Sequence, residues 1–173
     1  MAITVPERIH WAVEQLGIKG SESVLEIGCG RGVAADLVAG RLTTGRLVAI
    51  DRSETAIDAA RERNAGHESS KLTFVTSDVA RYDGASHSFD VVFAVNVNVF
   101  WLDPRAEMLV IRHVLKPEGR LWLFYEPPSA AQVSKIEKAC AENLDRHGFS
   151  VDTVLKAKAG SSALLKIVAR PVR

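Results

Sequence analysis

Short apolar runs alternate with segments of helical periodicity over most of this chain. The apolar runs that predict strands are Val24–Ile27, Arg46–Asp51, Leu72–Ser77, Phe89–Asn96 and Leu121–Tyr125, followed by Ser150–Leu155 and Ala163–Ala169. The segments with one apolar face, which predict helices, are Pro6–Leu16, Val33–Val38, Glu54–Arg63, Arg105–Leu115 and Ala130–Arg146. Strands that alternate with helices are typical of α/β domains built on a parallel sheet.

Capping residues and turn signals separate these elements. Ser53, Asp103 and Ser129 each precede a predicted helix and are expected to be its N-cap. Pro104 then takes the first helical position of its helix, where a missing N–H costs nothing. Lys116–Gly119 is predicted to be a turn between a helix and the fifth strand.

The first predicted strand runs directly into a glycine-rich segment. Glu26 is followed by Gly28, Gly30 and Gly32, after which a helix opens. Glycine tolerates positive φ and has no Cβ, so such a loop can turn tightly while its backbone touches a ligand. The first N–H groups of the following helix are unpaired and face the same crevice. This order of strand, loop and helix is typical of the first half of a nucleotide-binding unit.

Acidic or polar residues stand at the ends of the next three predicted strands. Asp51 ends the second strand, Asp78 follows the third and Asn96 ends the fourth. In open parallel sheets, ligands bind beyond the carboxyl ends of the strands. A short carboxylate at such a position can accept hydrogen bonds from both hydroxyls of a ribose, and Asp51 is placed to do so.

Together these motifs resemble those of the class I S-adenosylmethionine-dependent methyltransferases. The pattern E-x-G-x-G-x-G from Glu26 is similar to motif I, and Phe89–Val92 (F-D-V-V) is similar to motif IV. The segment Leu115–Leu121 resembles the L-K-P-G-G-x-L entry to strand five, with Glu118 in place of one glycine. The resemblance implies one domain over residues 1–173. Its fold would be a doubly wound, mostly parallel Rossmann-like sheet of seven strands in the order 3-2-1-4-5-7-6, with the last strand antiparallel and helices on both faces.

The resemblance also implies a cofactor, S-adenosylmethionine, and a set of residues that bind it. An acid at the end of strand three accepts from the adenine amine in this family, and the next backbone N–H reaches the ring; Asp78 and Val79 match these positions. The cofactor-binding residues expected are Glu26, Gly28, Cys29, Gly30, Gly32, Asp51, Arg52, Asp78, Val79 and Asn96. The sulfonium of this cofactor activates its own methyl group, so neither a nucleophile nor a metal is expected.

The methyl acceptor is less well indicated. Family members that act on amide or nucleobase nitrogen often carry N-P-P-Y or D-P-P-Y after strand four, and Asn96–Val99 does not match. A small-molecule acceptor is expected, with residues 1–20 as a candidate lid, and the acceptor atom stays open. The candidate acceptor contacts are His10, Trp11, Asn98, Trp101, Tyr125 and Glu126, each of which has a structural role as an equal alternative.

Composition narrows the class of protein. A net charge of +1 argues against a nucleic-acid partner, and no apolar run reaches the length of a membrane span. Cys29 and Cys140 form neither a disulfide framework nor a zinc motif, so the cytoplasm is expected. The sequence does not indicate an oligomeric state. Two alternatives stay open: a methyltransferase-like binding module without activity, and an NAD(P)-dependent oxidoreductase, although Val33 replaces the third glycine of the dinucleotide motif.

Overall fold

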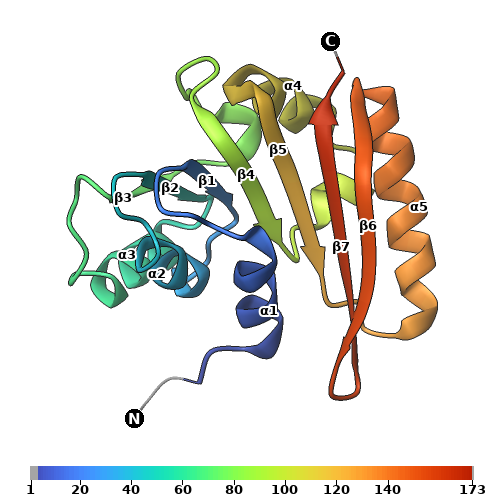
Figure 1. Cartoon of the computed structure of the whole chain (residues 1–173), viewed down its shortest axis with the longest axis horizontal. Coiled ribbons are helices and arrows are strands. Elements are labelled where there is room, and N and C mark those ends of the chain that lie inside the picture. Colours follow the sequence, from blue (N-terminus) through green and yellow to red (C-terminus); the bar gives the residue numbers. More distant parts are fainter. Residues whose placement is uncertain (1–3, 173) are drawn as a thin grey trace.

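A computed structural model describes residues 4–172, so the first three residues of the expected lid segment and residue 173 lie outside it. The described chain forms a seven-stranded sheet in the order β3-β2-β1-β4-β5-β7-β6 (Figure 1). The strands are β1 (Ser23–Ile27), β2 (Arg46–Asp51), β3 (Leu72–Thr76), β4 (Phe89–Val95), β5 (Leu115–Tyr125), β6 (Phe149–Ala159) and β7 (Ser162–Pro171). The predicted strand order is confirmed.

The sheet is parallel from β1 to β5 and becomes antiparallel at one edge. β7 pairs antiparallel with both β5 and β6, so the last two strands form a long hairpin at that edge. Gly160, with φ of 57°, lies in the connecting turn, and a bulge shifts the register between Val151 and Thr153. Both hairpin strands are longer than predicted because they pair beyond their apolar stretches, out to Ala159 and Ser162.

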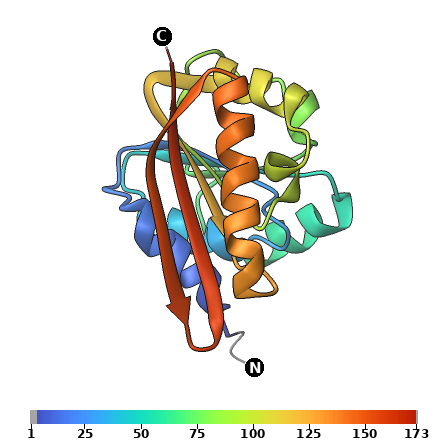
Figure 2. The same ribbon diagram turned by 90° about the vertical axis from the view of Figure 1, so that its right-hand side faces the viewer.

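Helices cover both faces of the sheet (Figure 2). The α-helices are α1 (Glu7–Leu16), α2 (Val33–Ala39), α3 (Glu54–Arg63), α4 (Arg105–Val114) and α5 (Ala130–Arg146), and two short 3₁₀ turns are η1 (Val79–Arg81) and η2 (Asn98–Trp101). On one face α1, α2 and α3 bury Val13, Val38 and Ile57 against Phe93 and Phe124. The other face is covered by α4 and α5, which enclose a second core that includes Met108, Ile111, Ile136 and Leu144. The central strands β1 and β4 are thus buried from both sides, which explains their continuous apolar runs.

Several predicted boundaries are wrong. The N-cap of α4 is Pro104 rather than Asp103, and the helix begins at Arg105. Ser129 is the N-cap residue of α5, yet its side chain makes no capping hydrogen bond. Similarly, Pro6 is the N-cap of α1 rather than its first helical residue.

The predicted turn at Lys116–Gly119 is part of β5. Phe89 of β4 pairs with Leu115, whereas Val91 pairs with Arg120, so β5 carries extra residues between these two pairs. The Arg120 guanidinium donates to the carbonyls of Glu118 and Gly119, at 2.8 and 3.2 Å, and so satisfies the irregular backbone. Turn residues here therefore mark a bulge in a strand and not a reversal of the chain.

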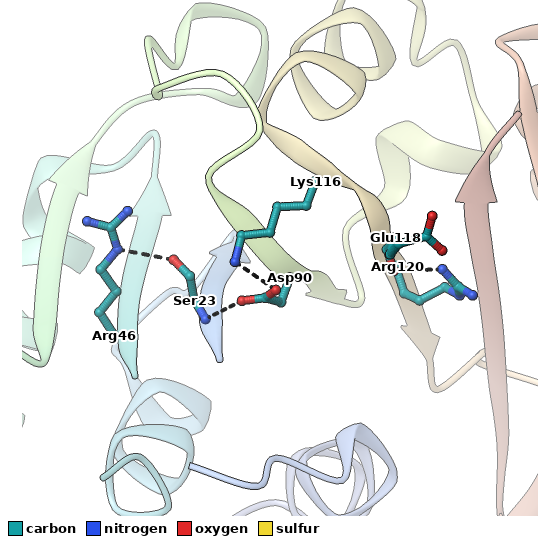
Figure 3. A network of polar contacts seen from close by, with 6 residues as sticks. All are labelled: Ser23, Arg46, Asp90, Lys116, Glu118 and Arg120. Carbon is teal, nitrogen blue, oxygen red and sulfur yellow. Dashed lines mark hydrogen bonds and ion pairs between the residues drawn. The ribbon is translucent and has the colours of Figure 1, made fainter. Parts of the chain in front are cut away.

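A network of polar contacts joins the amino ends of β1, β2, β4 and β5 (Figure 3). Asp90 accepts from the Ser23 N–H at 2.9 Å and from Lys116 Nζ at 2.8 Å. Arg46 Nε donates to Ser23 Oγ at 3.1 Å. Partial burial raises the pKa of Asp90, but the hydrogen bonds from Lys116 and Ser23 outweigh burial and hold this pKa below its usual value.

We expect Asp90→Asn to lower the free energy of unfolding at neutral pH by about 1 kcal/mol, since the bond to Lys116 is charge-assisted but partly exposed. A carboxyl whose pKa is lower in the folded state than in the unfolded state stabilises the fold at pH values above its pKa in the unfolded state. This contribution is lost as the pH falls through its pKa in the folded state. The difference between wild type and variant in urea unfolding should therefore shrink as pH falls from about 5, above the ordinary value of 3.8, to about 2. A difference that stays constant over this range would contradict the role assigned to the ionised carboxylate.

Candidate functional site

The carboxyl ends of four parallel strands border one cleft of about 620 Å³. Gly28 follows β1, Asp51 ends β2 and Arg52 follows it, Asp78 lies after β3 and Asn96 after β4, and all of these line the cleft. The remaining lining residues are Ile27, Ile50, Ser77, Val79, Val95, Val97, Asn98, Val99, Leu102 and Glu107. The structure thus brings together six of the ten residues predicted to bind the cofactor.

The glycine loop sits at one side of this cleft and needs its glycines for different reasons. A Cβ on Gly28 would lie 2.6 Å from Cγ2 of Val97, and a Cβ on Gly32 would lie 2.9 Å from Cβ of Ala60. These two glycines are required by packing within the protein. Gly30 has φ of 52°, and no atom of the described chain lies within 4 Å of the position its Cβ would take. Space beside Gly30 is therefore open to a ligand.

Asp51 connects this loop to the second strand. Its Oδ2 accepts from the Gly30 N–H at 2.8 Å, and its Oδ1 accepts from the Ser53 N–H at 2.9 Å. Ser53 in turn caps α3 by accepting from the Ala56 N–H, as predicted. Each carboxylate oxygen has two acceptor sites, so Asp51 keeps one on each oxygen for hydroxyl donors in the cleft.

Glu26 lies beneath the loop and is 4% exposed. Its Oε2 is buried, and no described residue donates a hydrogen bond to this atom. Burial, and then the nearby charge of Asp51, raise the pKa of Glu26 to about 8. Burial, Glu26 and Asp51 also raise the pKa of the neighbouring Cys29 thiol, so this cysteine is a buried, unreactive group.

Asp78 has a structural role as well as a place in the cleft. Its Oδ1 accepts from the Arg81 N–H at 3.0 Å and so caps η1, while its Oδ2 lies 3.6 Å from Arg81 Nε. Val79, the next residue, begins η1 and also lines the cleft. Asp78 thus both caps η1 and lines the cleft.

Asn96 joins the ends of β4 and β5. It adopts φ of 56°, and its Oδ1 accepts from the Glu126 N–H at 2.8 Å. Asparagine tolerates this left-handed conformation better than most residues. Asn98, two residues on, accepts from Trp101 Nε1 at 3.3 Å within η2.

Most candidate acceptor contacts lie away from the cleft. His10 is exposed, and Trp11 packs edge-on against Phe124 with a ring distance of 5.6 Å. Trp101 is half-buried against the α5 core. Tyr125 is 3% exposed, and its hydroxyl donates to the Val97 carbonyl at 3.0 Å, which leaves it no surface for an acceptor.

A smaller cavity of about 340 Å³ lies next to Glu126 and is bordered by Pro127, Pro128 and residues 161–163 of the hairpin turn. The Glu126 carboxylate forms an ion pair with Arg8 of α1 at 3.2 Å. A further cavity, of about 520 Å³, lies where β6 and β7 meet the Lys116–Gly119 bulge, and none of the predicted site residues lines it. Residues 4–172 contain no cluster of metal-ligating side chains and no helix that could cross a membrane.

Sequence reasoning missed the far wall of the cleft. Val97, Val99 and Leu102 belong to the segment between β4 and α4, and Glu107 belongs to the first turn of α4. Glu107 follows no glycine or strand-end signal, because it lies on α4, and that helix packs onto η1 beside the cleft. Within the described residues of this wall, the one local sequence signal is the acid Glu107, three residues after Pro104 at the start of α4.

Comparison with known proteins places this geometry in a family. Residues 24–119 match the methyltransferase domain. A similar sequence is sterol 24-C-methyltransferase erg6 of Aspergillus fumigatus, 34% identical over 112 residues, which make up 64% of this chain and 29% of that protein. The matched part of this chain thus covers less than a third of the length of that curated relative.

Solved structures share the whole fold at low sequence identity. A SAM dependent methyltransferase from Aquifex aeolicus superimposes with a TM-score of 0.78 at 18% identity, over 95% of this chain and 89% of that one. The geranyl diphosphate C-methyltransferase from Streptomyces coelicolor A3(2), in complex with Mg²⁺, geranyl diphosphate and S-adenosyl-L-homocysteine, gives 0.74 at 13% identity, over 95% and 80%. At these identities the likeness shows a common fold.

The buried Glu26 predicts a specific pH dependence of stability. The folded state keeps the Glu26 proton up to about pH 8, whereas the unfolded chain releases it near pH 4.5. The unfolded state therefore binds fewer protons in this range, and stability should fall as pH rises, by at most about 1.4 kcal/mol per pH unit. Glu26→Gln, which keeps the shape without the titration, should lose this decline in urea unfolding at pH 5, 6.5 and 8. The exposed Glu62→Gln serves as control, and parallel profiles for Glu26→Gln and wild type would contradict the prediction.

Proposed function

We propose that this chain, which belongs to the methyltransferase domain family, binds S-adenosylmethionine in the 620 Å³ cleft. We also propose that it transfers the methyl group of this cofactor to a small molecule. The observation that carries this proposal is the convergence of the glycine loop, Asp51 and Asp78 on one cleft, in a chain whose residues 24–119 match that family.

Two features of the site support binding of this cofactor. The open space beside Gly30 leaves the loop backbone accessible, and the free acceptor sites of Asp51 suit the two ribose hydroxyls. Asp78, Val79 and Arg52 border the part of the cleft proposed for adenine. When bound, the cofactor supplies an electrophilic methyl carbon through its sulfonium.

The protein's contribution to catalysis is then mainly binding and orientation, which together can supply much of the rate acceleration. Glu26, Gly28, Cys29, Gly30 and Gly32 form the proposed loop wall. Among these, Glu26 presents an oxygen without a donor. Asn96 closes the end of the cleft by its bond to the Glu126 backbone.

We place the acceptor beside Glu126, in the cavity of about 340 Å³. Asn96 lines the cofactor cleft and Glu126 lines the second cavity, so their 2.8 Å hydrogen bond connects the two spaces. The Arg8 ion pair holds the start of α1 over Glu126, which suits a lid. The similar proteins named above act on a sterol and on geranyl diphosphate, which supports a small-molecule acceptor.

We further propose that residues 1–173 act as one domain in the cytoplasm, where the unpaired thiols Cys29 and Cys140 would stay reduced. The alternative that remains is a binding module with this fold and no methyl transfer, since a fold does not fix an activity. Titration with S-adenosylhomocysteine and with NAD tests the cofactor. A turnover screen that follows S-adenosylhomocysteine release over small alkenes, carboxylates, amines and alcohols tests the activity. Binding without turnover of any acceptor class would favour the module.

Asp51→Ala should weaken S-adenosylhomocysteine binding by roughly tenfold to a hundredfold, because it removes a charged acceptor from the proposed ribose hydroxyls. Isothermal titration calorimetry measures this loss, with Asp58→Ala on the exposed face of α3 as the matched control. Equal affinity of Asp51→Ala and Asp58→Ala would rule out the ribose assignment.

Gly30→Val should abolish cofactor binding while the protein stays folded by circular dichroism. A valine side chain would occupy the space that is open beside Gly30, and its φ of 52° adds strain for a β-branched residue. Gly30→Ala is the control for strain, because it carries the φ penalty with less bulk. If Gly30→Val still binds S-adenosylhomocysteine normally, the loop does not approach the ligand as proposed.

A further inference from the structure

Glu107 is a carboxylate in the cleft to which no role has yet been given. It is the third residue of α4 and is partly buried, whereas Arg105 and Ala106 before it are exposed. Its side chain lines the cleft together with Asp78 and Val79. α4 contacts η1, and Glu107 lines the same cleft as Val79 of η1, in the part proposed for adenine.

No hydrogen bond or ion pair to the Glu107 carboxylate occurs within residues 4–172. A glutamate at the third helical position commonly accepts from the backbone N–H of the N-cap residue. The N-cap of α4 is Pro104, which has no N–H, so this bond cannot form. The usual structural use of this side chain is thus excluded, and its acceptor oxygens are free.

The other carboxylates of the cleft are already engaged. Asp51 holds the N–H groups of Gly30 and Ser53, and Asp78 holds the N–H of Arg81. The second oxygen of Asp78 lies 3.6 Å from the Arg81 guanidinium. Glu107 is therefore the lining carboxylate with the most acceptor capacity left for a ligand.

We infer that Glu107 is a specificity-determining residue that accepts a hydrogen bond from the exocyclic amine of the cofactor's adenine. The inference rests on the proposed function, because it assumes adenine at the Asp78 side of the cleft. The amine carries two N–H donors, which two carboxylates, Asp78 and Glu107, can accept. A keto oxygen in the same place would meet acceptors alone, because a carboxylate cannot donate. The pair would thus select adenine over hypoxanthine.

The test compares S-adenosylhomocysteine with S-inosylhomocysteine, in which a keto oxygen replaces the amine, by calorimetry on the full chain. Glu107→Gln should weaken S-adenosylhomocysteine about tenfold, since a charge-assisted bond is lost. The inosine analogue should bind to this variant at least as tightly as to the wild type, because the glutamine amide can donate to the keto oxygen. The melting temperature without ligand should change by no more than roughly 2 °C, as for a surface substitution.

Glu62→Gln on α3 removes the same charge at an exposed site away from the cleft and is the matched control. Equal losses for both ligands, or no loss for S-adenosylhomocysteine, would overturn the role of Glu107. If the variant melts more than roughly 5 °C lower and loses affinity equally for both ligands, Glu107 is a structural residue. That result would also overturn its role in specificity. Failure of the wild type to bind S-adenosylhomocysteine would instead refute the proposed function itself, so the two failures are distinguishable.

Discussion

The geometry of the candidate site depends on the carboxylate of Asp51. This side chain ends β2 and holds the backbone N–H groups of Gly30 and Ser53 at 2.8 and 2.9 Å. It therefore fixes the loop after β1 relative to the start of α3, which are far apart in the chain. The parallel register of β1 and β2 makes this possible, since Ile27 pairs with Ile50 and both strands end at the same edge. A flexible loop of glycines is thus held in one shape by its neighbour.

The same region carries an unfavourable group. Glu26 is buried beneath the loop with an oxygen that no described residue satisfies. A buried polar atom without a partner reduces stability, and such groups in native proteins often mark functional sites. The loop therefore gives up stability at the place where the protein is proposed to hold its ligand.

The strands were predictable from the sequence because their signals are local, whereas their order and the antiparallel edge were expected only from the resemblance to a family. Apolar runs between Gly28, Asp51, Asp78 and Asn96 indicated both the strands and the edge at which their ends meet. The far wall of the cleft could not be predicted in this way, because the contact of Glu107 with the cleft depends on how α4 packs and not on its own segment. The burial of Tyr125 between β5 and α5 likewise depends on packing. The bulge at Lys116–Gly119 carries residue types that are typical of a turn. Only the pairing register between β4 and β5 distinguishes a bulge from a turn at this position.

The polar network around Asp90 and the ligand cleft lie at opposite ends of the same strands. Asp90 stands at the amino end of β4, where it ties Ser23 to Lys116, and Asn96 stands just past its carboxyl end. A substitution in the network can therefore alter how firmly the strands are held without touching the surface that meets a ligand. In evolutionary terms the fold has a reserve, because gains in stability at one end can compensate for new, destabilising side chains at the other.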